Sequence, residues 1–368
     1  MPYAHITGWG MSVPDKVMTN DDLSKIVDTN DEWIRERTGI RERRIARDGQ
    51  FPSTLGTEAC LRALRVANVA PSSVDLVICS SSSPEYIFPA TACLIQDQIG
   101  ASSAGAFDIQ AACTGFIFSL NLAAQSIRSG TIKTALVVGT ETLSRFMNWK
   151  DRSTCILFGD GAGAFVLQAS DEPGGVFEGV MRSDGSGGDL LSIPAGGSRH
   201  PATDITLHTA MHYVQMDGKE VYRFATKVMA QATRDALARS NMKLEDLDMI
   251  IPHQANVRII EAAARALKMP MDKFVVNLDR YGNTSTASIP IATVEAVEQG
   301  RLKRGDKLVF VGFGGGLTWG ASAAQWTGPL PTLQKVNPDR EALFGRLRSQ
   351  LRRAVRHAEG ILNRRELD

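Results

Sequence analysis

The sequence predicts an α/β fold in which one unit of strands and helices occurs twice, and three observations support this. The 368 residues are enough for two ordinary domains or one large one. Two separated stretches match each other when the sequence is shifted by about 173 positions. Apolar strands without polar alternation are followed in turn by amphipathic helices, which is typical of mostly parallel sheets covered on both faces. Two such sheets placed back to back share central helices and give five layers.

The internal repeat keeps one offset in two places. Residues 59–78 and 232–251 carry the same or similar side chains at nine positions, and residues 136–139 match 309–312 in the same way. Chance rarely preserves one offset across separate segments, and the period is far too long for a solenoid. We therefore predict two halves, residues 1–172 and 173–328.

Each half carries the same predicted order of helix, buried strand, helix and buried strand. In the first half these elements cover 59–67, 74–79, 113–128 and 134–139, and in the second half 225–239, 247–251, 285–299 and 307–312. The stretch 185–209 is rich in Gly, Ser and Pro and is expected to form a long loop between the halves.

Residues 329–368 are predicted to form a basic C-terminal extension. Pro329 and Pro331 interrupt the chain, and 339–362 then has helical periodicity. The expected apolar stripe consists of Leu343, Leu347, Leu351, Val355 and Leu362. The extension has nine basic and five acidic residues. The favoured interpretation is that the stripe packs on its own protein or on a second copy. Binding of an acidic partner stays open, and contact with a membrane surface is possible but less favoured.

Charge and cysteine content exclude several classes of protein. Lys and Arg number 41 against 40 Asp and Glu, so no general attraction for nucleic acid is expected. The five cysteines include no Cys-x-x-Cys pair, which argues against a zinc site and against a secreted disulfide scaffold. The first residues lack the pattern of a secretion signal, and no apolar run is long enough to span a bilayer. The sequence therefore predicts a cytoplasmic enzyme.

Cys113 is the leading candidate nucleophile. It follows an apolar strand and opens a helical segment among the small residues Ala111, Ala112 and Gly115. A thiol at a helix N-terminus is near the positive end of the helix dipole, which favours the thiolate, and small neighbours permit a sharp turn. On these features alone an inert core cysteine remains the commoner outcome.

His253 and Asn283 occupy positions that suit a site. His253 comes directly after the strand 247–251, and in α/β sheets ligands gather at the carboxyl ends of strands. Asn283 lies in a turn that leads into a helix, where a structural role as a cap is the simpler interpretation.

Two glycine runs could be mistaken for nucleotide-binding loops. Residues 159–164 read Gly-Asp-Gly-Ala-Gly-Ala, but apolar strand sequence surrounds them instead of a strand leading into a helix. Residues 312–316 read Gly-Phe-Gly-Gly-Gly, with no following Lys-Ser or Lys-Thr. The second run is better suited to present backbone amides to a pocket as an oxyanion hole.

Together the three motifs identify a family. With Cys113 in Ala-Ala-Cys-Thr-Gly-Phe, His253 in Pro-His-Gln-Ala-Asn and Asn283 in Gly-Asn-Thr-Ser, the chain closely resembles the β-ketoacyl-acyl-carrier-protein synthase III family of the thiolase superfamily. The resemblance runs from about Ile6 to Trp326. It implies a thiolase-like duplicated five-layered αβαβα sandwich with two mixed, mostly parallel sheets. It also implies a homodimer without metal or redox cofactor.

The resemblance implies a reaction as well. Cys113 would take the acyl group of an acyl-CoA primer, and malonyl-acyl carrier protein would lose carbon dioxide and attack the resulting thioester. His253 and Asn283 would donate hydrogen bonds to the enolate, and the amides of Cys113 and Gly315 would form the oxyanion hole. The product, a β-ketoacyl chain, would initiate fatty-acid or related acyl-chain synthesis. Two alternatives stay open: transfer of the acyl group to an alcohol or amine, and a non-catalytic partner subunit.

Further positions match family residues one by one. Trp33 and Arg152 match residues that sandwich the CoA adenine, and Phe88 matches a residue that crosses the dimer interface to the partner's acyl pocket. The remaining substrate-binding candidates are Arg37, Met216, Gly218, Asn256 and Phe313, and the candidates for docking the carrier protein are Arg223, Arg258 and Arg265. The length and branching of the primer stay open, as does whether the extender is bound to a carrier protein or to CoA.

Overall fold

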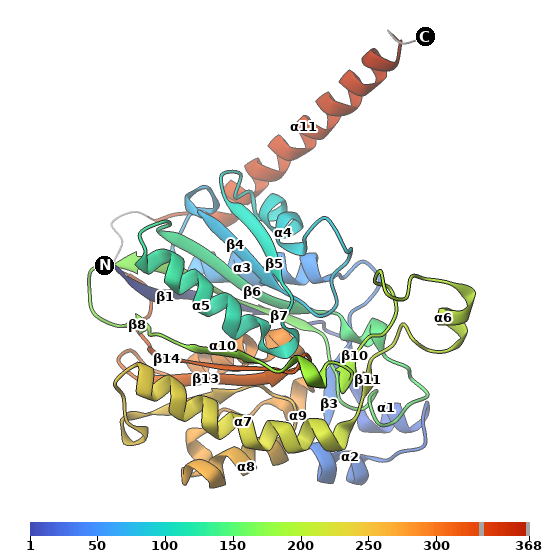
Figure 1. Cartoon of the computed structure of the whole chain (residues 1–368). Helices are drawn as coiled ribbons and strands as arrows, with labels where there is room; N and C mark the ends of the chain where they lie inside the picture. The colour runs from blue at the N-terminus through green and yellow to red at the C-terminus, as the bar shows by residue number, and fades with distance from the viewer. Residues whose placement is uncertain (331–334, 366–368) are drawn as a thin grey trace.

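Two mixed β-sheets form the framework of the computed structural model, which describes residues 1–330 and 335–365 (Figure 1). The strand order is β1-β7-β6-β4-β5 in the first sheet. In the second it is β12-β13-β14-β8, with β9 also paired to β14. In each sheet one strand, β7 or β14, runs opposite to the others. The prediction of mixed sheets in which most strands run the same way is confirmed.

The strands of the two sheets are two to ten residues long, and those in the middle of each sheet are mostly buried. Their bounds are β1 (Tyr3–Ser12), β4 (Leu76–Ser80), β5 (Gly105–Ile109), β6 (Thr134–Glu141), β7 (Gly161–Ser170), β8 (Gly175–Val176), β9 (Val180–Ser183), β12 (Met249–Pro252), β13 (Lys307–Gly314) and β14 (Thr318–Gln325). Two hairpins lie outside these sheets and are formed by β2 (Val17–Thr19) with β3 (Glu42–Arg44) and by β10 (Leu191–Ser192) with β11 (Gln215–Met216).

Helices cover both sheets and fill the space between them. The α-helices are α1 (Asn20–Ser24), α2 (Asp31–Thr38), α3 (Pro52–Ala67), α4 (Thr91–Ile99), α5 (Gly115–Arg128), α6 (Asp204–His208), α7 (Gly218–Arg239), α8 (Val257–Leu267), α9 (Leu278–Tyr281), α10 (Ser288–Glu298) and α11 (Pro338–Arg365). The 3₁₀ helices are η1 (Pro71–Ser73), η2 (Ala112–Thr114), η3 (Leu143–Phe146), η4 (Gly185–Gly187), η5 (Leu244–Asp246), η6 (Met271–Lys273) and η7 (Ser285–Ala287).

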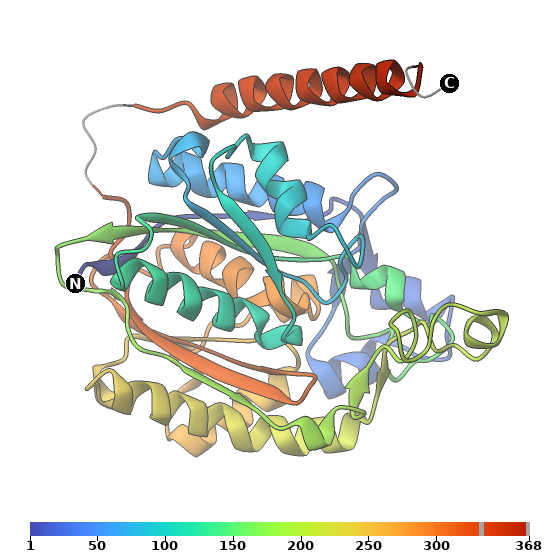
Figure 2. The ribbon, with the colours of Figure 1, turned by 45° about the horizontal axis from the view of Figure 1, so that its top comes forward.

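The layers follow the predicted αβαβα order. Helices α3 and α4 pack on the outer face of the first sheet, and α7 and α8 cover the outer side of the second. Helices α5 and α10 lie between the sheets, as Figure 2 shows most clearly. These two central helices are buried on nearly all sides, which matches their apolar sequences.

The duplication extends from the sequence into the structure. Strands β4 and β6 of the first sheet correspond to β12 and β13 of the second at the predicted offset. The counterpart of β5 is reduced to an isolated parallel bridge between Ile250 and Phe274. The boundary predicted at residue 172 falls between β7 and β8, and the division into two halves and an extension stays a prediction.

Several elements start earlier than the apolar periodicity indicates, because capping residues determine where helices begin. Helix α3 begins with Pro52 at its first turn, and α7 begins at Gly218 after Asp217, whose carboxylate accepts hydrogen bonds from the next backbone amides. The predicted loop 185–209 contains η4, β10 and α6. Its glycines and prolines therefore separate short elements.

The C-terminal helix α11 packs on the body with a face opposite to the predicted one. Ala342 is buried, and Gly345 lies so close to Gly100 at the end of α4 that a side chain at residue 345 would collide with it. The predicted stripe is exposed from Leu343 to Val355, and the side chain of Leu362 lies outside the described part of the structure. The small residues Ala342 and Gly345 face the body because they allow the backbones of α11 and α4 to approach closely. Among the described residues, no helix has the length and apolar character needed to cross a bilayer.

Candidate active site

Cys113 sits in a tight turn between strand β5 and helix α5. Ala112 before it has a positive φ of 45°, an unusual conformation for a residue with a side chain. Gly314 of β13 fits against this turn because it lacks a Cβ, which would lie 2.7 Å from the Cys113 amide nitrogen. The close approach of the two backbones thus requires glycine at residue 314 and leaves little room beside Ala112.

The thiol lines a cavity of about 720 Å³. Cys113, Ser285 and Gly315 lie on its wall together, although they come from distant parts of the chain. Much of the remaining wall is apolar and is formed by Leu143, Phe146, Phe158, Leu191, Ile193 and Val214. A cavity of this kind can hold an aliphatic chain next to the sulfur.

Burial controls the ionisation of this thiol. Removal from water raises the pKa of Cys113 to about 12, and the hydroxyl of Ser285 beside the sulfur only partly offsets this effect. Burial therefore opposes the thiolate that the helix end favours, and the role of Cys113 as a nucleophile stays a prediction. The helix N-terminus is present, but the sequence could not show how completely the thiol is shielded from water.

His253 follows β12 and is held in place by the hydroxyl of Ser288. The distance from Nδ1 to Ser288 Oγ is 2.7 Å, and the same oxygen accepts a hydrogen bond from the Gln254 amide. Among the described residues, the Ser288 hydroxyl has no other acceptor for its proton, so it donates to Nδ1. The neutral ring then carries its hydrogen on Nε2.

Nε2 of His253 is buried and has no hydrogen-bond partner in the described part of the chain. Burial lowers the pKa of this imidazole to about 3, so it is neutral at physiological pH. A buried donor without a partner is costly unless a ligand satisfies it. This ring can therefore serve as a neutral hydrogen-bond donor.

Asn283 has its side-chain amide fixed in one orientation. Its Oδ1 accepts a hydrogen bond of 2.8 Å from the backbone amide of Ser285, which leaves the NH₂ group as the available donor. Its own backbone bonds to Leu157 and Gly159 anchor the residue on the neighbouring chain segment. The predicted role as a turn residue and a role as a donor are thus compatible.

Strand β13 brings these groups to one place. A Cβ at Gly312 would lie 3.2 Å from the Cβ of His253, and Gly314 touches the Cys113 turn. Residues two apart on a strand face the same side, so the Cβ of His253 and the turn of Cys113 lie along one face of β13. Asn283 joins them through Ser285, which borders the cavity beside the thiol.

The buried carboxylate of Glu141 supports the site and was not among the residues predicted from the sequence. Glu141 at the end of β6 accepts hydrogen bonds from the Ser82 amide and the Ser83 and Thr286 hydroxyls. Burial raises the pKa of this carboxyl group, and these donors oppose the shift. The signal that could have found it is one acidic residue in an otherwise uncharged buried strand. Ser285 and Ser288 were missed as well, although they stand in the same motif as Asn283.

The adenine-binding candidates form a cluster on α2. The guanidinium carbons of Arg37 and Arg152 lie 4.5 and 5.1 Å from the centre of the Trp33 ring. Two flat groups that hold a third between them are about 7 Å apart, so the present distance between Trp33 and Arg152 is too short to admit adenine. Binding would require the half-exposed side chain of Arg152 to move away from Trp33 and from its contact with Asp28.

The other substrate-binding candidates are more scattered. Asn256 caps α8 and donates a hydrogen bond to the carbonyl of Arg37. Met216 pairs with the cavity residue Leu191 across the β10–β11 hairpin, next to Gly218 at the start of α7. None of these residues, nor Trp33, is among those that line the cavity at Cys113 in the described structure.

Phe88 and Phe313 have opposite environments. Phe88 is 84% exposed, in a segment whose neighbour Ile87 borders the cavity. Phe313 is buried and its ring contacts the edge of His253 at 5.4 Å between centroids. Phe313 is therefore placed to support the imidazole, whereas Phe88 is free to contact another molecule.

The carrier-docking candidates lie on the adjacent helices α7 and α8. Arg223 pairs with Glu220, Arg265 lies 3.9 Å from Glu261, and Arg258 stacks over a tyrosine ring. All three arginines thus already interact with neighbouring side chains on this surface. In the described chain no group of three His, Cys, Asp or Glu side chains is arranged to hold a metal ion.

Comparison with known proteins places the chain in a family. Family models for 3-oxoacyl-acyl-carrier-protein synthase III match residues 107–185, and those for its C-terminal part match 237–326. A β-ketoacyl-acyl-carrier-protein synthase III from Roseiflexus is 51% identical over 325 residues, covering 88% of this chain and 99% of its own. One from Desulfitobacterium hafniense is 53% identical and covers 88% and 97%. The chain belongs to the β-ketoacyl-acyl-carrier-protein synthase III family.

Solved structures agree with this assignment. The synthase III of Aquifex aeolicus superposes with a TM-score of 0.81 at 45% identity, covering 88% of this chain and 99% of its own. The priming β-ketosynthase of the R1128 polyketide pathway gives 0.83 at 35% identity, with 89% and 97% covered. The thiolase-like fold predicted from the motifs is thereby confirmed. The C-terminal family model ends at residue 326, so the extension that carries α11 lies beyond the part shared with these members of the synthase III family.

Proposed function

We propose that the protein joins an acyl-CoA primer to a malonyl group by decarboxylating Claisen condensation, with Cys113 as the acyl carrier. The observation that carries this proposal is the neutral imidazole of His253, whose buried Nε2 has no hydrogen-bond partner in the described part of the chain. A strong base is not needed in this chemistry, because loss of carbon dioxide itself generates the carbanion. The reaction instead requires a neutral hydrogen-bond donor for the oxygen of the enolate.

The first half-reaction forms a new thioester. The sulfur of Cys113 attacks the carbonyl carbon of the acyl-CoA, and the proton of the thiol ends on the departing CoA sulfur. Burial raises the pKa of this thiol, and because the thiolate is the attacking form, the thiol has to lose its proton in this step. The apolar wall of the cavity then surrounds the acyl chain.

The second half-reaction uses His253 and Asn283. The malonyl thioester loses carbon dioxide, and its carbonyl oxygen becomes negative as the enolate forms. The Nε2–H of His253 and the NH₂ of Asn283 donate hydrogen bonds to that oxygen. Each such preorganised donor is typically worth about 3 to 4 kcal/mol.

The enolate carbon then attacks the Cys113 thioester. A carbon–carbon bond forms, the carbon–sulfur bond breaks, and the thiolate takes a proton from solvent to regenerate the thiol. We assign the transient oxyanion to the backbone amides of Cys113 and Gly315, which border the same cavity. The released product is a β-ketoacyl thioester that initiates fatty-acid or related acyl-chain synthesis.

The wider assignments follow from the family and stay proposals. The primer is an acyl-CoA bound near Trp33, the extender is carried by acyl carrier protein, and neither metal nor redox cofactor is required. We place the enzyme in the cytoplasm as a homodimer, in which the exposed Phe88 reaches the partner's cavity.

The two half-reactions provide the test. Cys113→Ser should abolish acylation in an intact-mass assay with acyl-CoA. His253→Ala and Asn283→Ala should still form the acyl-enzyme but release carbon dioxide from malonyl-carrier protein roughly 10² to 10³ times more slowly. Acyl transfer without any carbon dioxide release by the wild type would refute the condensation. Equal loss of both half-reactions in Asn283→Ala would refute the role given to that amide.

A further inference from the structure

The extension beyond the family core ends in a helix that lies at the edge of the molecule. Figures 1 and 2 show α11 as the outermost element on the side of α3 and α4, away from the second sheet. It is tied to the body by Arg65 with Asp339, by Arg353 with Asp97, and by Arg346 with the Gln98 carbonyl. Its orientation relative to α4 is therefore set by several contacts.

This orientation turns the apolar side of α11 to the solvent. Residues four apart on a helix lie on one face, and the face in question carries Leu343, Phe344, Leu347, Leu351 and Val355. Each of them is about half exposed or more, from 48% at Val355 to 66% at Leu351. A continuous row of exposed large apolar side chains on one helix marks an interaction surface. We call these five residues the outer stripe.

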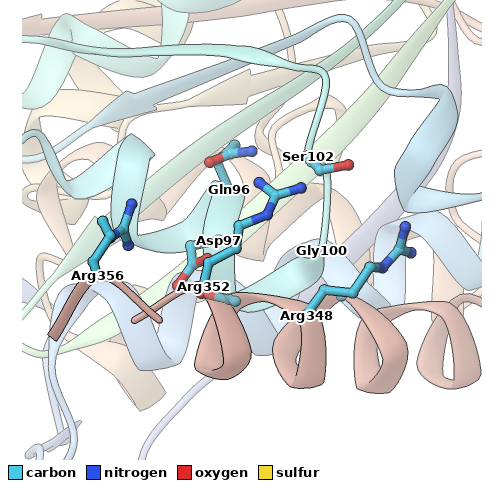
Figure 3. A pocket seen from close by; sticks show the side chains of 9 residues that line it. Gln96, Asp97, Gly100, Ser102, Arg348, Arg352 and Arg356 are labelled. Atoms are coloured by element: carbon cyan, nitrogen blue, oxygen red, sulfur yellow. The ribbon is translucent and has the colours of Figure 1, made fainter. Parts of the chain in front are cut away.

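Arginines border the outer stripe. Arg348 is three residues from Leu351, and Arg352 is three residues from Val355, so both lie along its edge. Figure 3 shows Arg348, Arg352 and Arg356 on successive turns, beside a hollow of about 190 Å³ between α4 and α11. Within the described residues, Arg352 and Arg356 have no carboxylate partner.

We propose that α11 docks the enzyme onto the surface of an anionic lipid bilayer. A helix with leucines and phenylalanine on one side and arginines along its edges is typical of segments that lie in the plane of a membrane surface. The outer stripe enters the boundary between headgroups and acyl chains, and the arginines contact lipid phosphates. Because α11 is the outermost element, the bilayer reaches it without meeting the body.

Two other occupants fit the structure less well. A second copy of α11 would bring two helices together that each carry eight arginines and three acidic residues, and their charges would repel. An acyl carrier protein bound here would be on the side of the molecule opposite to α2 and α8, which carry the substrate-binding candidate Trp33 and the carrier-docking candidates Arg258 and Arg265. Neither objection applies to anionic lipid.

Vesicle sedimentation with the full-length enzyme tests the proposal. The probes are vesicles of phosphatidylcholine alone and of phosphatidylcholine mixed with phosphatidylglycerol. We expect sedimentation with the mixed vesicles, weakened by salt, and little with phosphatidylcholine alone. The variant Leu347→Glu/Leu351→Glu should lose binding at least tenfold. Charge removal by R348Q/R352Q/R356Q should reduce it about a hundredfold, at roughly fivefold for each arginine.

Matched controls separate the outer stripe from general surface effects. Leu207→Glu alters an equally exposed leucine on α6, and R301Q/K303Q/R304Q removes three positive charges before β13. Both controls should bind like the wild type, and all four variants should keep wild-type condensation activity. Failure of the proposed condensation would leave these binding results unaffected.

Several results would overturn the proposal. Equal binding to both vesicle types, no binding to either, or unchanged binding of Leu347→Glu/Leu351→Glu would each do so. An oligomer that depends on the outer stripe and forms without vesicle binding would assign α11 to a second copy. Capture by immobilised acyl carrier protein in the absence of vesicle binding would assign it to that partner.

Discussion

Replacing Ser288 by alanine tests whether this hydroxyl makes His253 a donor. The hydroxyl lies 2.7 Å from Nδ1 of His253. Both residues are buried, so bulk water cannot take over the hydrogen bond when the hydroxyl is removed. Leaving a buried polar atom without its partner costs about 1 to 3 kcal/mol. In the wild type, the hydrogen bond from Ser288 stabilises the ring form that carries hydrogen on Nε2 by this free energy. When that stabilisation is lost, we expect the condensation rate to decrease about 5- to 150-fold.

The assay compares the two half-reactions in one preparation. Acylation of Cys113, followed by intact mass, should change less than about threefold, whereas carbon dioxide release by the pre-acylated enzyme should fall by the factor given above. The matched control is Ser119→Ala, because Ser119 is also a buried serine but its hydroxyl has no hydrogen-bond partner in the described structure. That control should leave both rates unchanged and should not lower the free energy of unfolding.

The reasoning is refuted if Ser288→Ala slows acylation as much as condensation, since the hydroxyl would then act on the fold of the whole site. It is refuted equally if condensation stays within about twofold of wild type. Nitrogen chemical shifts of the His253 ring provide a separate measurement. They should report hydrogen on Nε2 in the wild type and mainly on Nδ1 in the variant, since a decrease of about fivefold or more requires the donor form to become the minor one.

Two further predictions concern His253 and Gly314. The pKa of His253 is lowered to about 3 in the folded protein, against about 6.5 in an unfolded chain, so between these values only the unfolded state binds the proton. The neutral, buried His253 therefore stabilises the fold above pH 6.5, and this contribution is lost as the pH falls. In urea titrations, the free energy of unfolding of the wild type relative to His253→Gln should decrease by about 3 kcal/mol between pH 7 and pH 4. Gly314→Ala places a methyl group 2.7 Å from the Cys113 nitrogen, and we expect loss of acylation in the intact-mass assay while circular dichroism remains that of a folded protein; an active Gly314→Ala enzyme would contradict the close packing of this turn.

Local sequence patterns were sufficient for the fold and for the sharp turn that carries Cys113. The offset of 173 residues predicted the duplicated sheets because apolar strands such as β6 and β13 must be buried on both faces wherever they occur. The small residues beside Cys113 predicted a sharp turn, and the structure shows this turn packed against the backbone of Gly314. In both cases the pattern itself is local and covers a few residues of one strand or one turn.

Properties that depend on surroundings could not be predicted in the same way. The ionisation of Cys113 depends on how much protein shields it, and the sequence contains the helix end but not the shielding. The orientation of α11 depends on the meeting of Gly100 and Gly345, which are 245 positions apart in the chain. A stripe of leucines indicates that a helix has an apolar face, but not which neighbour that face meets.

The duplication also explains how a site can combine one nucleophile with several donors. Turn η7 repeats turn η2 at the same offset, and Ser285 has a φ of 46° where Ala112 has 45°. At the position of the thiol the second turn has Thr286, which bonds to the buried Glu141 and so has a structural task. The two turns contact each other, which places the residues that flank the second turn next to Cys113. One copy therefore carries the thiol, and the hydrogen bond of Thr286 to Glu141 anchors the turn of the other copy, which directly follows the proposed donor Asn283.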